Sequence, residues 1–161
     1  MKARLVTVAA ALALIYGLPV AAGDAVARFE GGIGMNPELR AGFPNFVRGV
    51  MPGGRIWRIQ ALKARVRRDG SIVVKGEGLL LAGSDQIGSR DFIANVKATL
   101  LCGSDSFDSH YVPLSATGDF EIRDVSNPVP PATCDAPVLL IRAAELSDAW
   151  IAAGVPAAPD E

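Results

Sequence analysis

The residues that could perform catalysis lie close together in one short segment, residues 103–110. Its side chains with suitable chemistry are Ser104, Asp105, Ser106, Asp108, Ser109 and the sole histidine of the chain, His110. A serine nucleophile needs a histidine base and a carboxylate that orients it, so a hydrolytic site would have to be built here. Residues this close on one loop rarely hold that geometry, and the chain has no Gly-x-Ser-x-Gly turn. We therefore expect His110 to be an ordinary loop histidine, with a small hydrolase as the alternative.

Metal and cofactor sites are disfavoured by the same kind of argument. Residues 103–109 offer many oxygen atoms but lack the Asp-x-Asp-x-Asp-Gly spacing of a calcium loop, so a solvated loop is favoured over a weak calcium site. One histidine and two cysteines cannot supply a zinc site if the cysteines are oxidised. Gly76, Gly78 and Gly83 do not match a dinucleotide fingerprint, because the third glycine is too distant. We expect no metal and no cofactor.

The N-terminus has the pattern of an export signal. Lys2 and Arg4 form a basic head, an uncharged apolar run continues to Tyr16, and small residues precede a cleavage point after Ala22. An uncleaved membrane anchor is the alternative, but Pro19 interrupts a span that needs about 20 apolar residues. We predict a helical signal peptide over residues 1–22, and a secreted, extracellular mature chain with no membrane span.

The two cysteines are Cys102 and Cys134. In an oxidising compartment the default for such a pair is a disulfide, and two buried free thiols are the alternative. In the loop-entropy model, closing a loop of this length stabilises the fold by about 3 to 4 kcal/mol.

A predicted β-hairpin over residues 60–82 organises the rest of the chain. A three-residue loop, with Gly70 at positive φ, pairs Val66 with Ile72 and makes one hairpin face apolar. The same register pairs Ala64 with Val74, Leu62 with Gly76, and Lys63 with Lys75. Because side chains alternate between faces, the other face and its turn are basic, with Lys63, Arg65, Arg67, Arg68 and Lys75.

Two interpretations of this basic face remain open. In the first, which we favour, Asp119 and Glu121 lie across from it on a later strand and form exposed ion pairs of little energetic value. In the second, the face docks an anionic surface, such as an envelope polymer or phospholipid headgroups. We expect no nucleic-acid partner.

The remaining sequence predicts short strands over residues 92–102, 110–115, 119–124, 137–143 and 150–155, with the second and third of them paired as a hairpin across residues 116–118. In the first of these, Ala94, Val96 and Ala98 alternate with Asn95, Lys97 and Thr99, which should face solvent. Residues 23–54 are expected to be an irregular lead-in with edge strands at 25–29 and 46–50, and residues 156–161 a mobile tail. Helix is expected only near residues 144–149.

Seven or eight short antiparallel strands favour an all-β fold. We predict a two-sheet antiparallel β-sandwich, immunoglobulin-like in architecture, over residues 55–155, with a small closed barrel as the alternative. Leu79, Leu80 and Leu81 place leucines on both faces of one strand. One side therefore needs a cover, either the lead-in or a second subunit in a homo-oligomer.

Five blocks of the sequence resemble those of small exported bacterial proteins of unassigned function. The blocks are GLLLAG at 78–83, ATLLC at 98–102, GDFEI at 118–122, PPATC at 130–134 and PVLLIR at 137–142. The resemblance implies a secreted all-β domain with one disulfide, and it carries over no catalytic residue. The sequence thus predicts a secreted, non-catalytic interaction or envelope-associated protein, whose partner is an unknown protein or an anionic envelope polymer. A secreted hydrolase around His110 is the alternative.

Overall fold

The computed structural model describes residues 24–37 and 44–158. The predicted signal peptide, residues 1–22, and the end of the predicted tail, residues 159–161, lie outside the described residues. The first five strands are β1 (Ala25–Gly34), β2 (Trp57–Arg58), β3 (Ala61–Arg67), β4 (Ser71–Glu77) and β5 (Leu80–Leu81). The others are β6 (Asn95–Cys102), β7 (Asp105–Asp108), β8 (Val112–Pro113), β9 (Phe120–Val125), β10 (Val138–Ala143) and β11 (Ala149–Pro156). The 3-10 helix η1 (Ala144–Leu146) lies between the last two strands, where the sequence allowed a helix.

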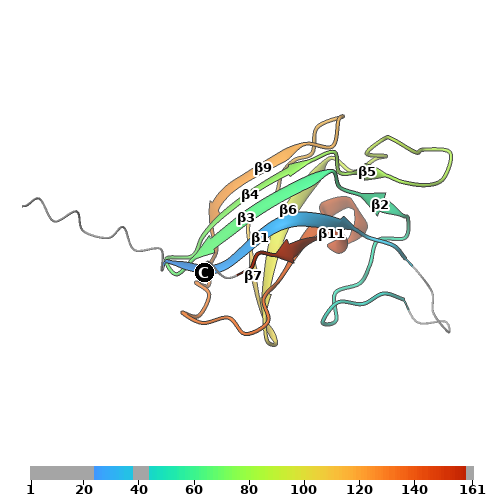
Figure 1. Ribbon diagram of the computed structural model, residues 1–161. Helices are drawn as coiled ribbons and strands as arrows, with labels where there is room; N and C mark the ends of the chain where they lie inside the picture. The colour runs from blue at the N-terminus through green and yellow to red at the C-terminus, as the bar shows by residue number, and fades with distance from the viewer. Residues whose placement is uncertain (1–23, 38–43, 159–161) are drawn as a thin grey trace, which may run out of the picture.

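Nine strands form one antiparallel sheet, in the order β7-β6-β10-β11-β1-β3-β4-β9 with β8 paired to β6. The strands β2 and β5 form a separate two-stranded ribbon. Figure 1 shows the large sheet curling on itself as a half-barrel, with the short ribbon beyond one end of β3 and β4. The all-β prediction is confirmed. The predicted pair of stacked sheets is replaced by one curled sheet, which is closer to the barrel alternative.

The reason for this difference is β1. The sequence placed residues 25–29 at an edge of the fold, but β1 is ten residues long and lies between β3 and β11. It joins the hairpin half of the sheet to the β6-β10-β11 half, so that neither half forms a sheet of its own. Its register against β11 shifts between Phe29 and Gly32, a bulge that bends the strand and helps the sheet to curl.

A glycine in β1 allows a close approach to the ribbon. A Cβ atom on Gly34 would lie 2.0 Å from the Trp57 carbonyl oxygen and 2.5 Å from the Arg58 Cα. Both are backbone atoms, so no side-chain rotation could relieve such a clash. The absence of a side chain at position 34 is therefore a requirement for packing β2 against β1.

The central hairpin has the register that the sequence predicts. Val66 faces Ile72, Ala64 faces Val74 and Leu62 faces Gly76. Gly70 adopts a φ of 85°, and its amide donates to the Arg67 carbonyl oxygen. The three-residue turn with a left-handed glycine thus fixes which face of β3 and β4 enters the core.

The second predicted hairpin is correct at its turn and wrong in its strand pairing. The Ser115 amide donates to the Asp119 carbonyl oxygen and the Gly118 amide donates to Ser115, as a loop over residues 116–118 requires. The strand before this turn, β8, pairs with β6 instead of β9. Proline at 113 fits this short strand, because proline cannot donate to a longer ladder.

The leucines of β5 and its neighbour are covered by the chain itself. Leu79, Leu80 and Leu81 are all buried, and the β5 residues pair with Trp57 and Arg58 of β2. The strand that pairs with β5 is β2, which follows the lead-in of residues 23–54 and is therefore neither of the two covers considered. These leucines leave no apolar surface to attract a second subunit. Across residues 24–37 and 44–158, no helix has the length and apolar character needed to cross a bilayer.

We predict that Gly34→Ala lowers the free energy of unfolding by more than about 2 kcal/mol, because the new methyl group overpacks against backbone. Chemical denaturation measures this difference. The control is Gly54→Ala, since a Cβ at Gly54 meets no atom within 4 Å. That variant should lie within about 0.5 kcal/mol of the native protein. Equal stability of the two variants would show that β1 and β2 are not packed this closely.

Candidate functional site

The outer faces of β1, β3 and β4, directed away from the core, form an open groove of about 920 Å³. We call it the basic groove. Its charged lining residues are Arg28, Glu30, Lys63, Arg65 and Lys75, and its other lining residues are Phe29, Ala64, Val73, Ala157 and Ala158. Three residues of the sequence-predicted basic face therefore line the groove, and Arg28 of β1 joins them.

The strand register places the charges of the groove in rows across the sheet. One row runs Glu30, Lys63, Lys75, Glu121 from β1 to β9. Two lysines side by side repel each other, and an acid at each end of the row offsets that repulsion. In the next row Arg65 lies between Arg28 and Val73. The cations are thus concentrated at the centre of the face and the acids at its margins.

Two glutamates of this face, Glu77 and Glu121, form ion pairs with cations other than Lys63 and Arg65. Lys75 Nζ lies 2.7 Å from Glu77 Oε1, and this hydrogen bond and charge raise the pKa of Lys75. Arg123 binds Glu121 on the same strand. Within the part of the chain that the structure describes, Lys63 and Arg65 form no ion pair. Among the described residues, these two charges therefore have no counter-ion.

The expected ion pairing across the basic face is realised only in part. Glu121 does lie opposite Lys75, as that interpretation requires. Asp119 instead accepts hydrogen bonds from the Gly78 amide and the Thr117 hydroxyl, and these bonds lower its pKa. Its carboxylate thus serves the turn before β9.

The other two residues of the sequence-predicted basic face lie at its end. Arg67 is opposite Ala25 at the start of β1, and the Arg68 amide donates to the Asp24 carbonyl oxygen. Neither residue lines the basic groove. The hairpin turn therefore carries positive charge next to the basic groove. Substitutions at the turn and in the groove can be tested separately.

A second group of charges, the Lys97 cluster, lies on the outer face of β6 and β10. Lys97 Nζ is 2.9 Å from Asp108 Oδ2 and 2.9 Å from Asp148 Oδ2. The Thr99 hydroxyl donates to Asp108, and Arg142 Nε donates to the Asp148 carbonyl oxygen at 2.6 Å. The Tyr111 hydroxyl donates to Asp148, and the Tyr111 ring lies 5.1 Å from Lys97 Nζ.

This cluster corrects the expectation that Lys97 and Thr99 face solvent. They lie on the predicted side of β6, but they are 8% and 0% exposed. The contacts of these two side chains explain the difference, because Asp108, Tyr111, Arg142 and Asp148 surround them. The partners of Lys97 come from β7 and from the turn after η1, so local sequence did not reveal them.

The environment of the Lys97 cluster keeps its members in their ordinary charge states. Burial lowers the pKa of Lys97, but its hydrogen bonds to Asp108 and Asp148 outweigh burial and hold the pKa above its ordinary value. Burial raises the pKa of Asp148, but hydrogen bonds from Tyr111 and Lys97 outweigh it and lower that pKa. A lysine that remains protonated is no nucleophile at neutral pH. The geometry thus favours a structural role.

The contacts around His110 weigh against the hydrolase alternative. His110 is exposed, and its Nδ1 lies 2.7 Å from Asp124 Oδ2 on β9, not from Asp105 or Asp108. The Ser109 hydroxyl donates to the His110 carbonyl oxygen and accepts from the Ala98 amide. Ser109 is therefore bound to backbone groups, and Asp108 is bound by Lys97. These contacts do not assemble a triad from the residues that the sequence offered.

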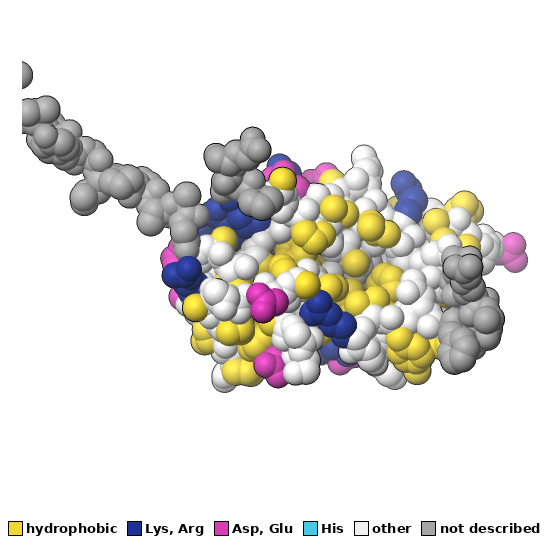
Figure 2. Space-filling model, turned by 60° about the horizontal axis from the view of Figure 1, so that its bottom comes forward, with side chains coloured by type: hydrophobic (Ala, Val, Ile, Leu, Met, Phe, Trp, Pro, Cys, Tyr) yellow, Lys and Arg dark blue, Asp and Glu magenta, His cyan; other side chains and the backbone are white. Residues whose placement is uncertain are grey.

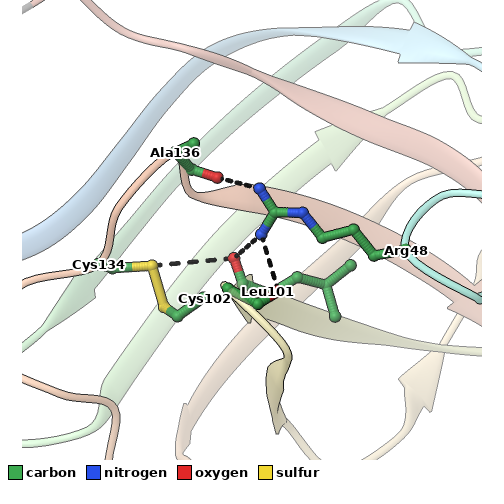
Figure 3. The surroundings of a disulfide bond; sticks show 6 residues. Arg48, Leu101, Cys102, Cys134 and Ala136 are labelled. Carbon is green, nitrogen blue, oxygen red and sulfur yellow. Dashed lines mark hydrogen bonds between the residues drawn. A yellow bond between two sulfur atoms is a disulfide. The ribbon is translucent and has the colours of Figure 1, made fainter.

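Cys102 and Cys134 form a disulfide, with their Cα atoms 5.1 Å apart, as predicted. Figure 3 shows Arg48 beside it, with the guanidinium directed at backbone carbonyls. Arg48 donates to the carbonyl oxygens of Leu101, Gly103 and Ala136, at 3.1, 3.4 and 2.5 Å. The disulfide and Arg48 together fasten the lead-in and the segment before β10 to the end of β6.

Comparisons with protein-family models, with curated proteins and with solved structures gave no match. Within residues 24–37 and 44–158, no group of His, Cys, Asp and Glu side chains is arranged to hold a metal ion. The basic groove is therefore the best-supported candidate site, because it combines an open concave surface with two cations, Lys63 and Arg65, that form no ion pair within the described part of the chain.

We predict that Lys97→Met lowers the free energy of unfolding by about 2 kcal/mol at neutral pH, because it leaves Asp108 and Asp148 with only the more distant cation of Arg142. Denaturation with the disulfide intact measures the loss. Lys63→Met is the matched control, since Lys63 is exposed and has no ion pair among the described residues. A stability loss as large at position 63 as at position 97 would contradict a structural role specific to the cluster.

We predict that Asp148→Asn weakens the fold in a pH-dependent manner. The folded-state pKa of Asp148 is lowered, so its charge contributes stability above the unfolded pKa of about 3.9, and that contribution disappears as the pH falls through the folded pKa. The difference from the native protein should therefore be present at pH 7 and shrink below about pH 4. Asn tolerates the φ of 62° at this position. Asp85→Asn, on an exposed loop, is the control and should show no such dependence.

Proposed function

We propose that the protein is an exported, non-catalytic interaction domain that docks on an anionic surface through the basic groove. The observation that carries this proposal is the position of Lys63 and Arg65, which lie at the centre of an open groove and have no ion pair among the described residues. A cation without a counter-ion in the protein produces a positive electrostatic potential that extends into solvent. A concave surface concentrates that potential.

Export is part of the proposal and is supported by two features. The N-terminal sequence has the order of a signal peptide, with Lys2 and Arg4 before an apolar run and small residues before position 22. The disulfide between Cys102 and Cys134 is compatible with an oxidising compartment outside the cytosol. An exported chain would meet envelope polymers and lipid headgroups, so both features support this choice of partner.

The arrangement of charges favours a repeating anion over a single small one. Lys63, Lys75, Arg65 and Arg28 occupy neighbouring positions on an open face, whereas Glu30 and Glu121 limit the patch on both sides. An open site gives each anion few contacts and little burial, so one anion would bind weakly. On a surface that presents many anions, binding of one anion raises the local concentration of its neighbours at the remaining cations. The domain is then held through avidity.

The hydrolase alternative has less support. Its histidine is paired with Asp124, and Ser109 is occupied by backbone groups. The groove needs no reacting group, because binding alone accounts for exposed cations on a rigid sheet.

We predict that the mature protein is retained on a polyanion column at low salt and that Lys63→Glu with Arg65→Glu abolishes retention, because the centre of the groove changes sign. Raising the salt concentration should release the native protein, since screening weakens contacts between exposed charges. The double variant Arg67→Glu with Arg68→Glu is the matched control, because it changes the net charge equally outside the groove.

The control variant should retain most of its binding to the column. Passage of the native protein without retention at low salt would refute the proposed function. Equal loss of binding in both double variants would assign the interaction to net charge and not to the groove. Circular dichroism of each variant verifies that the β structure is intact.

A further inference from the structure

We propose that the anionic surface recognised by the basic groove is a lipid bilayer containing anionic phospholipid. This inference rests on the proposed function and deepens it, because it selects one class of anionic partner. It is carried by a second feature of the same sheet face, a strip of apolar side chains that continues the groove along β11. The strip consists of Ile33, Ala153, Val155 and Ala157.

Register places the members of the apolar strip on the same face as the cations. Ile33 on β1 lies directly opposite Ala153 on β11. Val155 follows two residues later and therefore points to the same side, where its Cγ2 would lie 3.7 Å from a Cβ atom placed on Gly31. Ala157 continues the series, lines the groove, and its amide donates to the Arg28 carbonyl oxygen at 3.0 Å. Apolar strip and basic groove thus meet at Arg28 and Ala157.

The strip is accessible from outside. Ile33 is 61% exposed, and Ala153, Val155 and Ala157 are partly exposed. Figure 2, which looks at the molecule from below, shows hydrophobic side chains gathered over the middle of one face, with a few charged side chains among them and further Lys and Arg side chains toward its ends. An exposed isoleucine at the centre of a sheet, next to small apolar neighbours, has no evident role in the core.

The combination distinguishes a bilayer from a hydrated polymer. An anionic polysaccharide would contact the cations and leave the apolar strip in water, so the strip would add nothing to its binding. A bilayer with anionic lipid offers phosphates to Lys63 and Arg65, and an acyl boundary to Ile33 and Val155. Stable attachment to membranes ordinarily requires two such signals, buried apolar area together with attraction to anionic headgroups.

Vesicle co-sedimentation tests the inference. The full mature protein is mixed with vesicles of phosphatidylcholine alone, or of phosphatidylcholine with phosphatidylglycerol, and the bound fraction is measured. We expect binding to the mixed vesicles and little to phosphatidylcholine alone. Each cation removed should weaken binding about fivefold, so Lys63→Glu with Arg65→Glu should weaken it by at least about 25-fold.

The apolar strip is tested by Ile33→Ser, which should weaken vesicle binding several-fold while leaving retention on the polyanion column unchanged. Ile87→Ser is the matched control, because Ile87 is 68% exposed on a loop outside the strip. It should bind vesicles as the native protein does. Equal binding by the native protein and Ile33→Ser would overturn the role assigned to the strip.

A fluorescence readout reports insertion directly. Trp57 and Trp150 are each 4% exposed, so their emission should change little when the protein meets a vesicle. In Ile33→Trp, a new exposed indole should shift its emission to shorter wavelength on mixed vesicles and not with heparin. Absence of that shift at saturating lipid would contradict insertion.

The two proposals fail in distinguishable ways. Retention on the polyanion column without binding to mixed vesicles would overturn the lipid inference and leave the proposed function standing, with a soluble polymer as the partner. Failure in both assays would refute both proposals. Binding to phosphatidylcholine as tight as to the mixed vesicles would also overturn the inference, because the basic groove would then contribute nothing.

Discussion

The fold depends on the pairing of β1 with a strand on each side. One edge of β1 pairs with β3, the first strand of the β3-β4-β9 half of the sheet. The other edge pairs with β11, the first strand of the β11-β10-β6 half. Gly34 allows this strand to pass within backbone contact of β2, and the bulge before Gly32 lets the sheet bend. Because β1 supplies both halves with a hydrogen-bonding partner, they share one curled sheet and one core. Without it, the same strands would resemble the two separate layers that their local sequence predicts.

Local sequence was sufficient for the central hairpin, where the turn sets the register. The register from Leu62 to Gly76 follows from Gly70 and from alternation, since both strands are within a few residues of the turn. The position of β1 could not be predicted in the same way, because its glycines obscure the alternation and its partner β11 lies at the other end of the chain. The Lys97 cluster was equally hidden. Lys97 can be assigned to a face of β6 from periodicity, but its neutralisation by Asp108 and Asp148 depends on strands and turns that meet only in the folded protein.

The outer face of the sheet is divided into two parts with opposite properties. Over β6 and β10 the charges are buried or half-buried and balance one another, and Arg48 ties the lead-in to the strand end beside the disulfide. Over β1, β3 and β4 the charges are exposed or half-buried, and Lys63 and Arg65 have no internal partner among the described residues. A buried ion cluster is costly to separate, so the first part resists rearrangement. Recognition is therefore expected on the second part, which is open without any change in conformation and is held in place by the rigid first part.

Magnitudes explain why charge alone is an incomplete account of that recognition. A cation near an anionic membrane contributes about 1 kcal/mol, so Lys63 and Arg65 together contribute about 2 kcal/mol. A dissociation constant of 1 mM already corresponds to about 4 kcal/mol. The difference must come from neighbouring contacts on the same face, and the side chains that extend the groove along β11 are apolar. Burying the exposed part of Ile33 and its neighbours at about 25 cal/mol per Å² supplies a contribution of the required order. In the proposed docking, the placement of Ile33 and Val155 beside the cations would thus give the face a second source of affinity, which would act only on a partner that is both anionic and apolar.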